Sequence, residues 1–131
     1  MSDRGRRAHA EAAAHEEEVV RFLREMIAIP APSGGEQARC ERVRAEYERL
    51  GFDRVYFDRL GNVVAEVGRG PRTVLLDGHL DCVGVGDPEA WSHDPFAGKL
   101  EAGEVRGRGA VDELPAVACL AWGAHQAPRR G

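Results

Sequence analysis

The chain has 131 residues, of which 43% are hydrophobic and 31% charged, and its formal net charge is −4. This size and composition are typical of one soluble globular domain or part of one. The acidic balance gives no broad reason to expect nucleic acid, because the basic clusters lie near the termini, at 4–7 and 129–130. No apolar run approaches the roughly 20 residues that span a bilayer, and no secretory signal pattern is visible. We therefore expect a cytoplasmic protein that binds neither nucleic acid nor membranes.

The first fifty residues predict two helices. Residues 1–15 are expected to be a flexible N-terminus, although apolar residues already recur at helical spacing over 10–29. Prolines at 30 and 32 end this helix. Ser33 and Glu36 then have the spacing of a capping box at the start of a second helix, which ends at a glycine cap, with Phe52 folding back on its last turn. Its buried stripe is expected to be Cys40, Val43, Tyr47 and Leu50.

The remaining residues predict strands, turns and a last helix. Residues 55–57 and 63–67 are expected to form a strand pair, and 98–106 a hairpin. Residues 73–76 form a continuous apolar run, which is typical of a central strand covered on both faces. The apolar run 114–122 predicts a helix with a proline in its first turn, followed by an irregular tail over 124–131.

Three cysteines, Cys40, Cys82 and Cys119, form no CxxC pair and are odd in number. This argues against a disulfide framework or a structural zinc knot, so we expect reduced, mostly buried thiols. Cys82 adjoins Asp81, but a soft thiolate does not suit a site made of hard ligands, which disfavours a ligand role.

His79 and Asp81 follow the predicted central strand, and Asp112 follows a glycine-rich loop. Imidazole and carboxylate are ligand types that suit zinc. In an extended segment His79 and Asp81 point to the same side, so Asp81 is expected to hold the second ring nitrogen of His79. Spacing alone leaves a structural role for His79 open, because histidines at strand ends are often hydrogen-bonded structural residues. His93, in a nearby loop, is expected to have a structural or substrate-facing role.

Several motifs occur together in the order of one known family. Over residues 19–112 the chain resembles the amino-terminal part of the zinc-dependent aminoacylase, acetylornithine deacetylase, succinyl-diaminopimelate desuccinylase and carboxypeptidase G family. The motifs are IPAPSG at 29–34, GNV at 61–63, LDGHLD at 76–81, DPF at 94–96 after Trp91, and GRGAVD at 107–112.

The resemblance implies a three-layer α/β/α catalytic domain with a mixed sheet, of which 1–131 would be the N-terminal portion. It implies hydrolysis of an amide bond in an N-acyl amino acid or small peptide, and homodimers among full-length members. His79 would be a zinc ligand, Asp81 its supporting acid, and Asp112 the bridge between two zinc ions, with cobalt or manganese as alternatives. A general-base Glu and further ligands come later in the family.

Those later residues have no counterpart in the printed sequence, so we expect this chain by itself to be an inactive deacylase. The alternative is a non-catalytic binding or assembly module that supplies its half-site to a partner chain. A further departure is Glu113-Leu114-Pro115, where the family has a glycine-containing stretch, and this bulk puts the placement of Asp112 in doubt.

Overall fold

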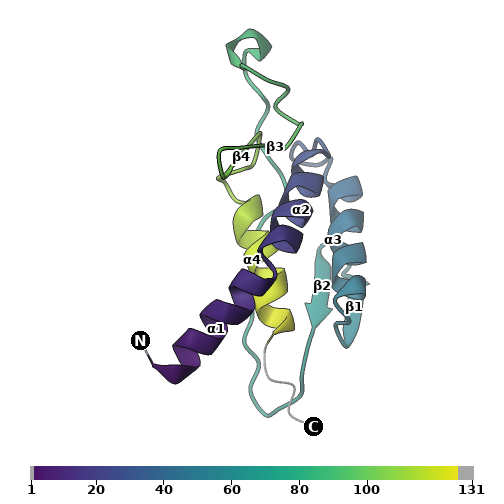
Figure 1. Cartoon of the computed structure of the whole chain (residues 1–131). Coiled ribbons are helices and arrows are strands. Elements are labelled where there is room, and N and C mark those ends of the chain that lie inside the picture. The colour runs from purple at the N-terminus through teal and green to yellow at the C-terminus, as the bar shows by residue number, and fades with distance from the viewer. Residues whose placement is uncertain (1, 127–131) are drawn as a thin grey trace.

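The structure is a computed structural model, and it describes residues 2–126. In Figure 1, α2, α3 and α4 lie side by side, and the segment that contains η1 extends beyond one end of these helices. The elements, in chain order, are α1 (Asp3–Ala14), α2 (Glu16–Ile27), α3 (Gln37–Arg49), β1 (Arg54–Phe57), β2 (Val63–Glu66), η1 (Pro88–Ala90), β3 (Lys99–Glu101), β4 (Glu104–Arg106) and α4 (Leu114–His125).

The N-terminal helical region is divided at His15. The sequence predicted one helix over 10–29 after a flexible N-terminus, whereas most of the first fifteen residues form α1. Ser2 caps this helix, because its hydroxyl oxygen accepts a hydrogen bond from the Gly5 amide at 3.2 Å. His15 has φ −112° and ψ 10°, which is not helical, and it separates α1 from α2.

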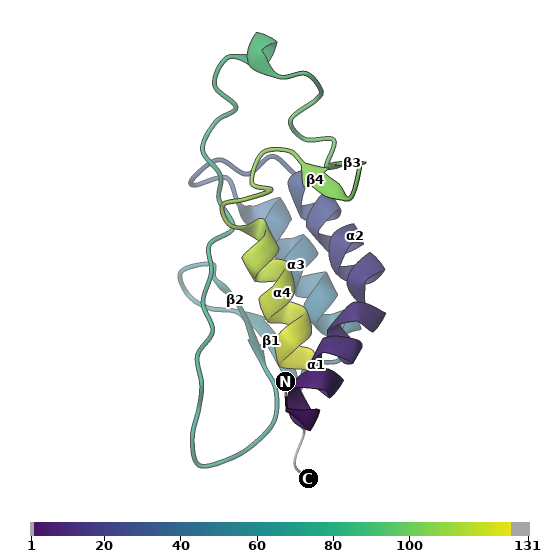
Figure 2. The same cartoon turned by 60° about the vertical axis from the view of Figure 1, so that its left-hand side comes forward.

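The core lies between α2, α3 and α4, which Figure 2 shows from a second side. The buried face predicted for α2 is confirmed, since Phe22, Met26 and Ile27 are fully buried. The predicted last helix is also confirmed, with Pro115 in its first turn. It continues to His125, so the irregular tail predicted from residue 124 is wrong at 124–125, and residues 127–131 of that prediction lie outside the described residues. This helix contributes Leu114, Val117, Ala118, Ala121 and Trp122 to the core. Burial of this apolar surface is the main favourable contribution to folding here.

The predicted capping box at the start of α3 is wrong. Glu36 is the N-cap residue, but its side chain accepts from the Gly34 amide at 2.7 Å and makes no cap to the helix. The Ser33 hydroxyl does not cap the helix either, because it donates to a carboxylate oxygen of Asp81, 48 positions along the chain. The start of α3 is therefore tied to a distant segment rather than closed locally.

The C-terminal end of α3 matches the prediction. Gly51 has φ +71°, the Phe52 amide donates to the Tyr47 carbonyl at 3.2 Å, and the Phe52 and Tyr47 rings are 5.0 Å apart. Within the predicted stripe Val43 and Leu50 are buried, whereas Cys40 and Tyr47 are half-buried. Two buried charged residues, Arg39 and Glu46, were not predicted.

Both predicted hairpins are confirmed. β1 pairs antiparallel with β2, Val55 opposite Ala65, and this hairpin packs on α3. β3 pairs antiparallel with β4, and the turn between them has positive φ at Ala102 and Gly103, 52° and 81°. Positive φ at both central residues of a two-residue turn matches the twist of the strands that it joins.

The predicted central strand at 73–76 is wrong for this structure. No described segment pairs with it, and Val74 and Leu75 are 82% and 85% exposed. A strand needs ladder partners for its backbone N–H and C=O groups, and residues 2–126 supply none here. The described residues form a small α/β arrangement with two two-stranded sheets, so the expected mixed sheet is not seen. None of the helices within this range is long and apolar enough to cross a membrane.

Candidate metal centre

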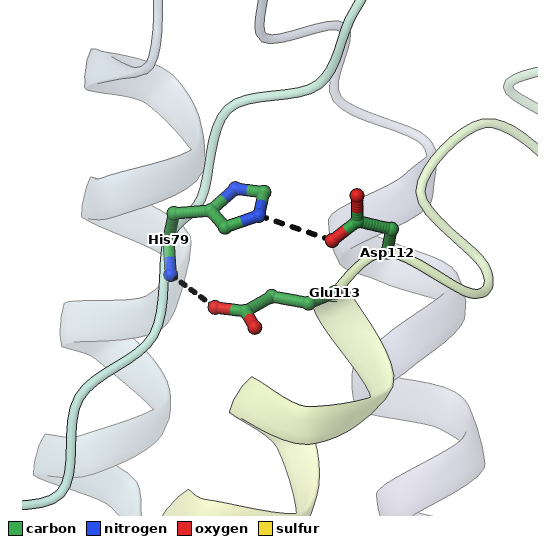
Figure 3. A group of neighbouring side chains, drawn as sticks. All are labelled: His79, Asp112 and Glu113. Atoms are coloured by element: carbon green, nitrogen blue, oxygen red, sulfur yellow. Dashed lines mark hydrogen bonds and ion pairs between the residues drawn. The ribbon is translucent and has the colours of Figure 1, made fainter.

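His79 and Asp112 come together from two distant segments (Figure 3). His79 lies between β2 and η1, and Asp112 comes just before α4. Nε2 of His79 is 3.2 Å from Oδ1 of Asp112. Glu113 joins them, since its Oε1 accepts a hydrogen bond from the His79 backbone amide at 2.5 Å. These three residues each offer a ligand atom, and the three atoms lie within 4.8 Å of one another.

Asp81 contacts the other side of the His79 ring. Nδ1 of His79 is 3.0 Å from Oδ1 of Asp81 and 3.1 Å from its backbone oxygen. The imidazole therefore lies between two carboxylates, with Nδ1 facing Asp81 and Nε2 facing Asp112. The structure brings together all three residues that the sequence singled out.

An open cleft of about 250 Å³ lies at this point. His79, Asp81, Cys82 and the loop 107–112 line it, and the side chains of His79 and Asp112 are 48% and 84% exposed. A molecule in solution therefore has access to the ring and the carboxylates. The loop packs closely against Cys82, because a Cβ on Gly109 would lie 2.7 Å from the Cys82 sulfur.

The charges of the site act on both partners of the His79–Asp81 contact. Desolvation lowers the pKa of His79, but the hydrogen bonds to Asp112 and to the Asp81 backbone, with the charges of Glu113 and Asp112, outweigh it, so the pKa lies above its ordinary value. The hydrogen bond from Ser33, aided by His79, holds the pKa of Asp81 below its usual range. Asp81 is thus favoured as a carboxylate that accepts from the ring.

The donor set fits a zinc ion chemically. His79 offers an imidazole nitrogen, and Asp112 and Glu113 offer carboxylate oxygens, which are zinc ligand types. Asp81 on Nδ1 is the kind of outer contact that fixes the tautomer of a zinc-bound histidine. Sequence reasoning missed Glu113 as a site residue and treated it as a departure from the family. Its position next to Asp112 was the available signal.

The other candidate residues are not members of this three-residue group. Cys82 is 7% exposed, and its sulfur accepts a hydrogen bond from Nη1 of Arg39 at 3.1 Å. Nδ1 of His93 is 3.2 Å from the Ser92 hydroxyl, and its ring lies 5.9 Å from that of Trp91. The cysteines are free, as expected, but not mostly buried. Cys119 is exposed and Cys40 half-buried.

No family model matches the chain. The uncharacterised protein YgeY of Escherichia coli strain K12 is 38% identical over 108 residues, which cover 82% of this chain and 27% of that protein. The succinyl-diaminopimelate desuccinylase of Methylobacterium sp. strain 4-46 is 52% identical over 60 residues, 46% of this chain and 15% of the enzyme. The succinyl-diaminopimelate desuccinylase of Methylobacterium nodulans is 53% identical over 60 residues, which are again 46% of this chain and 15% of the enzyme. The chain thus spans only 15–27% of the length of these relatives. The similarity supports a resemblance to this hydrolase family.

Proposed function

We propose that the polypeptide carrying this sequence is a metal-dependent hydrolase that cleaves amide bonds in N-acyl amino acids or small peptides. The observation that carries the proposal is the convergence of His79, Asp81 and Asp112 in one open cleft. Similarity to proteins named succinyl-diaminopimelate desuccinylase supports a small N-acylated, carboxylate-bearing substrate. The relatives are several times longer, so the proposal concerns the complete polypeptide.

In this proposal the imidazole of His79 and the carboxylate of Asp112 would hold zinc, and Asp112 would be shared between two ions. A bound zinc ion would polarise the amide carbonyl and lower the pKa of a water molecule. Asp81 holds the Nδ1 proton of His79, which leaves the Nε2 lone pair for the metal. Glu113 keeps the His79 backbone next to the start of α4.

We also propose a fold, a cellular compartment and an oligomeric state for the complete polypeptide. The complete polypeptide would contain a three-layer α/β/α catalytic domain with a mixed sheet. The protein would be cytoplasmic and homodimeric, and cobalt or manganese would serve as alternative metals.

The test is zinc binding combined with turnover of N-succinyl and N-acetyl amino acids. We expect isothermal titration of the metal-free polypeptide to show zinc binding, and His79→Ala to weaken it by more than about tenfold. His93→Ala is the matched control, because His93 lies outside the three-residue group, and it should leave zinc affinity unchanged. Turnover should disappear with a chelator and return with zinc.

The outcomes separate the two functions considered. Zinc binding with zinc-dependent turnover supports the hydrolase. Zinc binding with no turnover on any of these substrates favours the module that supplies a half-site to a partner. A wild-type polypeptide without measurable zinc affinity contradicts both.

A further inference from the structure

The segment that carries His79 and Asp81 is neither helix nor strand, so other contacts must hold it. The Cys82 amide donates to the Ala31 carbonyl at 2.8 Å. The Ser33 hydroxyl donates to Asp81 Oδ2. Ala31 and Ser33 both belong to the loop between α2 and α3, so this loop lies directly against the site segment.

Arg39, from the first turns of α3, joins the same two segments from inside the protein. Its side chain is fully buried. Nη1 donates to the Leu80 carbonyl at 2.5 Å and to the Cys82 sulfur at 3.1 Å, and Nη2 donates to the Ile29 carbonyl. One planar guanidinium thus cross-links residue 29 of the loop to residues 80 and 82 of the site segment.

The chemistry of arginine suits this position. Burying a cation costs free energy that hydrogen bonds must offset, and here the acceptors are two carbonyl oxygens and a thiol. The rigid fork of guanidinium donors reaches separate acceptors at once, whereas the ammonium of lysine is a single point on a flexible stem. Lysine would keep the charge but lose the cross-link.

We propose that Arg39 and Ser33 are positioning residues of the candidate metal centre. Arg39 fixes the backbone of the site segment, and Ser33 occupies one carboxylate oxygen of Asp81, so that the other faces Nδ1 of His79. A continuous set of contacts then runs from Ser33 through Asp81 and His79 to Asp112. This inference rests on the proposed function and adds residues that touch neither metal nor substrate.

The experiment measures the His79 ring directly and zinc affinity separately. In the complete polypeptide with ¹⁵N-labelled histidine, ring nitrogen shifts report which nitrogen holds the proton of the neutral ring. We expect Nδ1–H in the wild type. Ser33→Ala and Arg39→Lys should raise the Nε2–H share and weaken zinc binding by about tenfold, while Ser33→Thr, which keeps a hydroxyl, should retain wild-type values.

Matched controls exclude a general loss of structure. Ser92→Ala removes an exposed serine hydroxyl outside the group, and Arg44→Lys changes an exposed arginine on the same helix as Arg39. Neither should change the ring tautomer or the zinc affinity. Thermal unfolding of every variant shows that it is folded at the temperature of measurement.

Each outcome bears on a different claim. A tautomer unchanged in both Ser33→Ala and Arg39→Lys overturns the positioning role, even when the wild type binds zinc and the proposed function stands. If the wild type has no zinc affinity but Ser33→Ala and Arg39→Lys still change the tautomer, the positioning of the ring is supported and the metal site is contradicted.

Discussion

Gly109 is a position at the cleft where the structure leaves no room for a side chain. Its φ is +88°, and a Cβ would lie 2.7 Å from the sulfur of Cys82 and 2.8 Å from Cδ1 of Leu114. Both neighbours are buried, so a shift would disturb the packed core. We expect Gly109→Ala to lower the free energy of unfolding by about 1–3 kcal/mol, measured by urea denaturation.

Gly123 is the matched control for that substitution. It lies inside α4, and nothing stands within 4 Å of a Cβ built on it. Gly123→Ala should raise the free energy of unfolding by about 0.5–1 kcal/mol, because alanine is the better helix former. Equal effects of the two substitutions would contradict the close packing assigned to Gly109.

The three thiols should differ in reactivity. Cys119 is exposed, whereas Cys82 is buried. Burial, together with the charge of Glu36, raises the pKa of the half-buried Cys40 thiol, which reduces its thiolate fraction. With a chromogenic disulfide reagent we expect Cys119 to react first and Cys119→Ser to remove the fast phase. A fast phase that persists in Cys119→Ser but disappears in Cys82→Ser would show that the site segment opens readily.

At the scale of elements, the contact between α2 and α3 contains a buried carboxylate. Glu46 is 1% exposed and accepts from Arg42 at 2.7 Å and from Arg49 at 2.6 Å, and Arg42 also pairs with Glu25 of α2 at 2.5 Å. Desolvation raises the pKa of Glu46, but the hydrogen bonds from Arg49 and Arg42 outweigh it, so the pKa lies below its ordinary value. This stabilisation is therefore present above the ordinary glutamate pKa and is lost as the pH falls through the folded-state value.

Glu46→Gln should therefore lower the free energy of unfolding near neutral pH by about 1–3 kcal/mol, because a neutral amide replaces the buried carboxylate to which the partly exposed Arg42 and Arg49 donate. It should also reduce the loss of stability on acidification. Glu48→Gln is the control, since Glu48 forms an exposed pair with Arg44, and its effect should stay below about 1 kcal/mol. Denaturant titrations over a series of acidic pH values measure both effects. An unchanged acid slope in Glu46→Gln would contradict the assignment.

The elements that could be predicted from the sequence are those fixed by local patterns. The apolar spacing of α2, the glycine that ends α3 and the turn of the β3–β4 hairpin each depend on neighbours along the chain. The capping box failed because the partner of Ser33 lies 48 positions away, which no local rule detects. The strand at 73–76 failed because a strand depends on a partner that residues 2–126 do not supply.

In the whole molecule, the candidate site shows the same difference between what local patterns predict and what long-range contacts decide. His79, Asp81 and Asp112 could be selected from motif order and ligand chemistry, and the structure brings them together. Arg39 could not be selected, because its contact joins segments 41 positions apart, and the only local signal for Glu113 was its position next to Asp112. Long-range contacts of this kind are visible only once the chain is folded.

The exposed apolar segment at 73–76 affects the whole molecule. Val74 and Leu75 are 82% and 85% exposed, and the backbone beside them has no strand partner among the described residues. An unpaired apolar strand is a template for pairing with another chain. We expect the chain as printed to self-associate as its concentration rises, and Leu75→Lys to reduce this in sedimentation velocity. Leu100→Lys, at an exposed position of the already paired β3, should have a smaller effect.

The size of the effect of Leu75→Lys on the free energy of unfolding distinguishes the two environments of this segment. If further chain in the complete polypeptide covers residues 73–76, Leu75→Lys would bury a charge and lower the free energy of unfolding by several kcal/mol. If the segment stays exposed there, the substitution should leave stability within about 0.5 kcal/mol and only reduce association. Chemical denaturation of the complete polypeptide with and without Leu75→Lys therefore tests whether this segment is covered, independently of any metal or substrate.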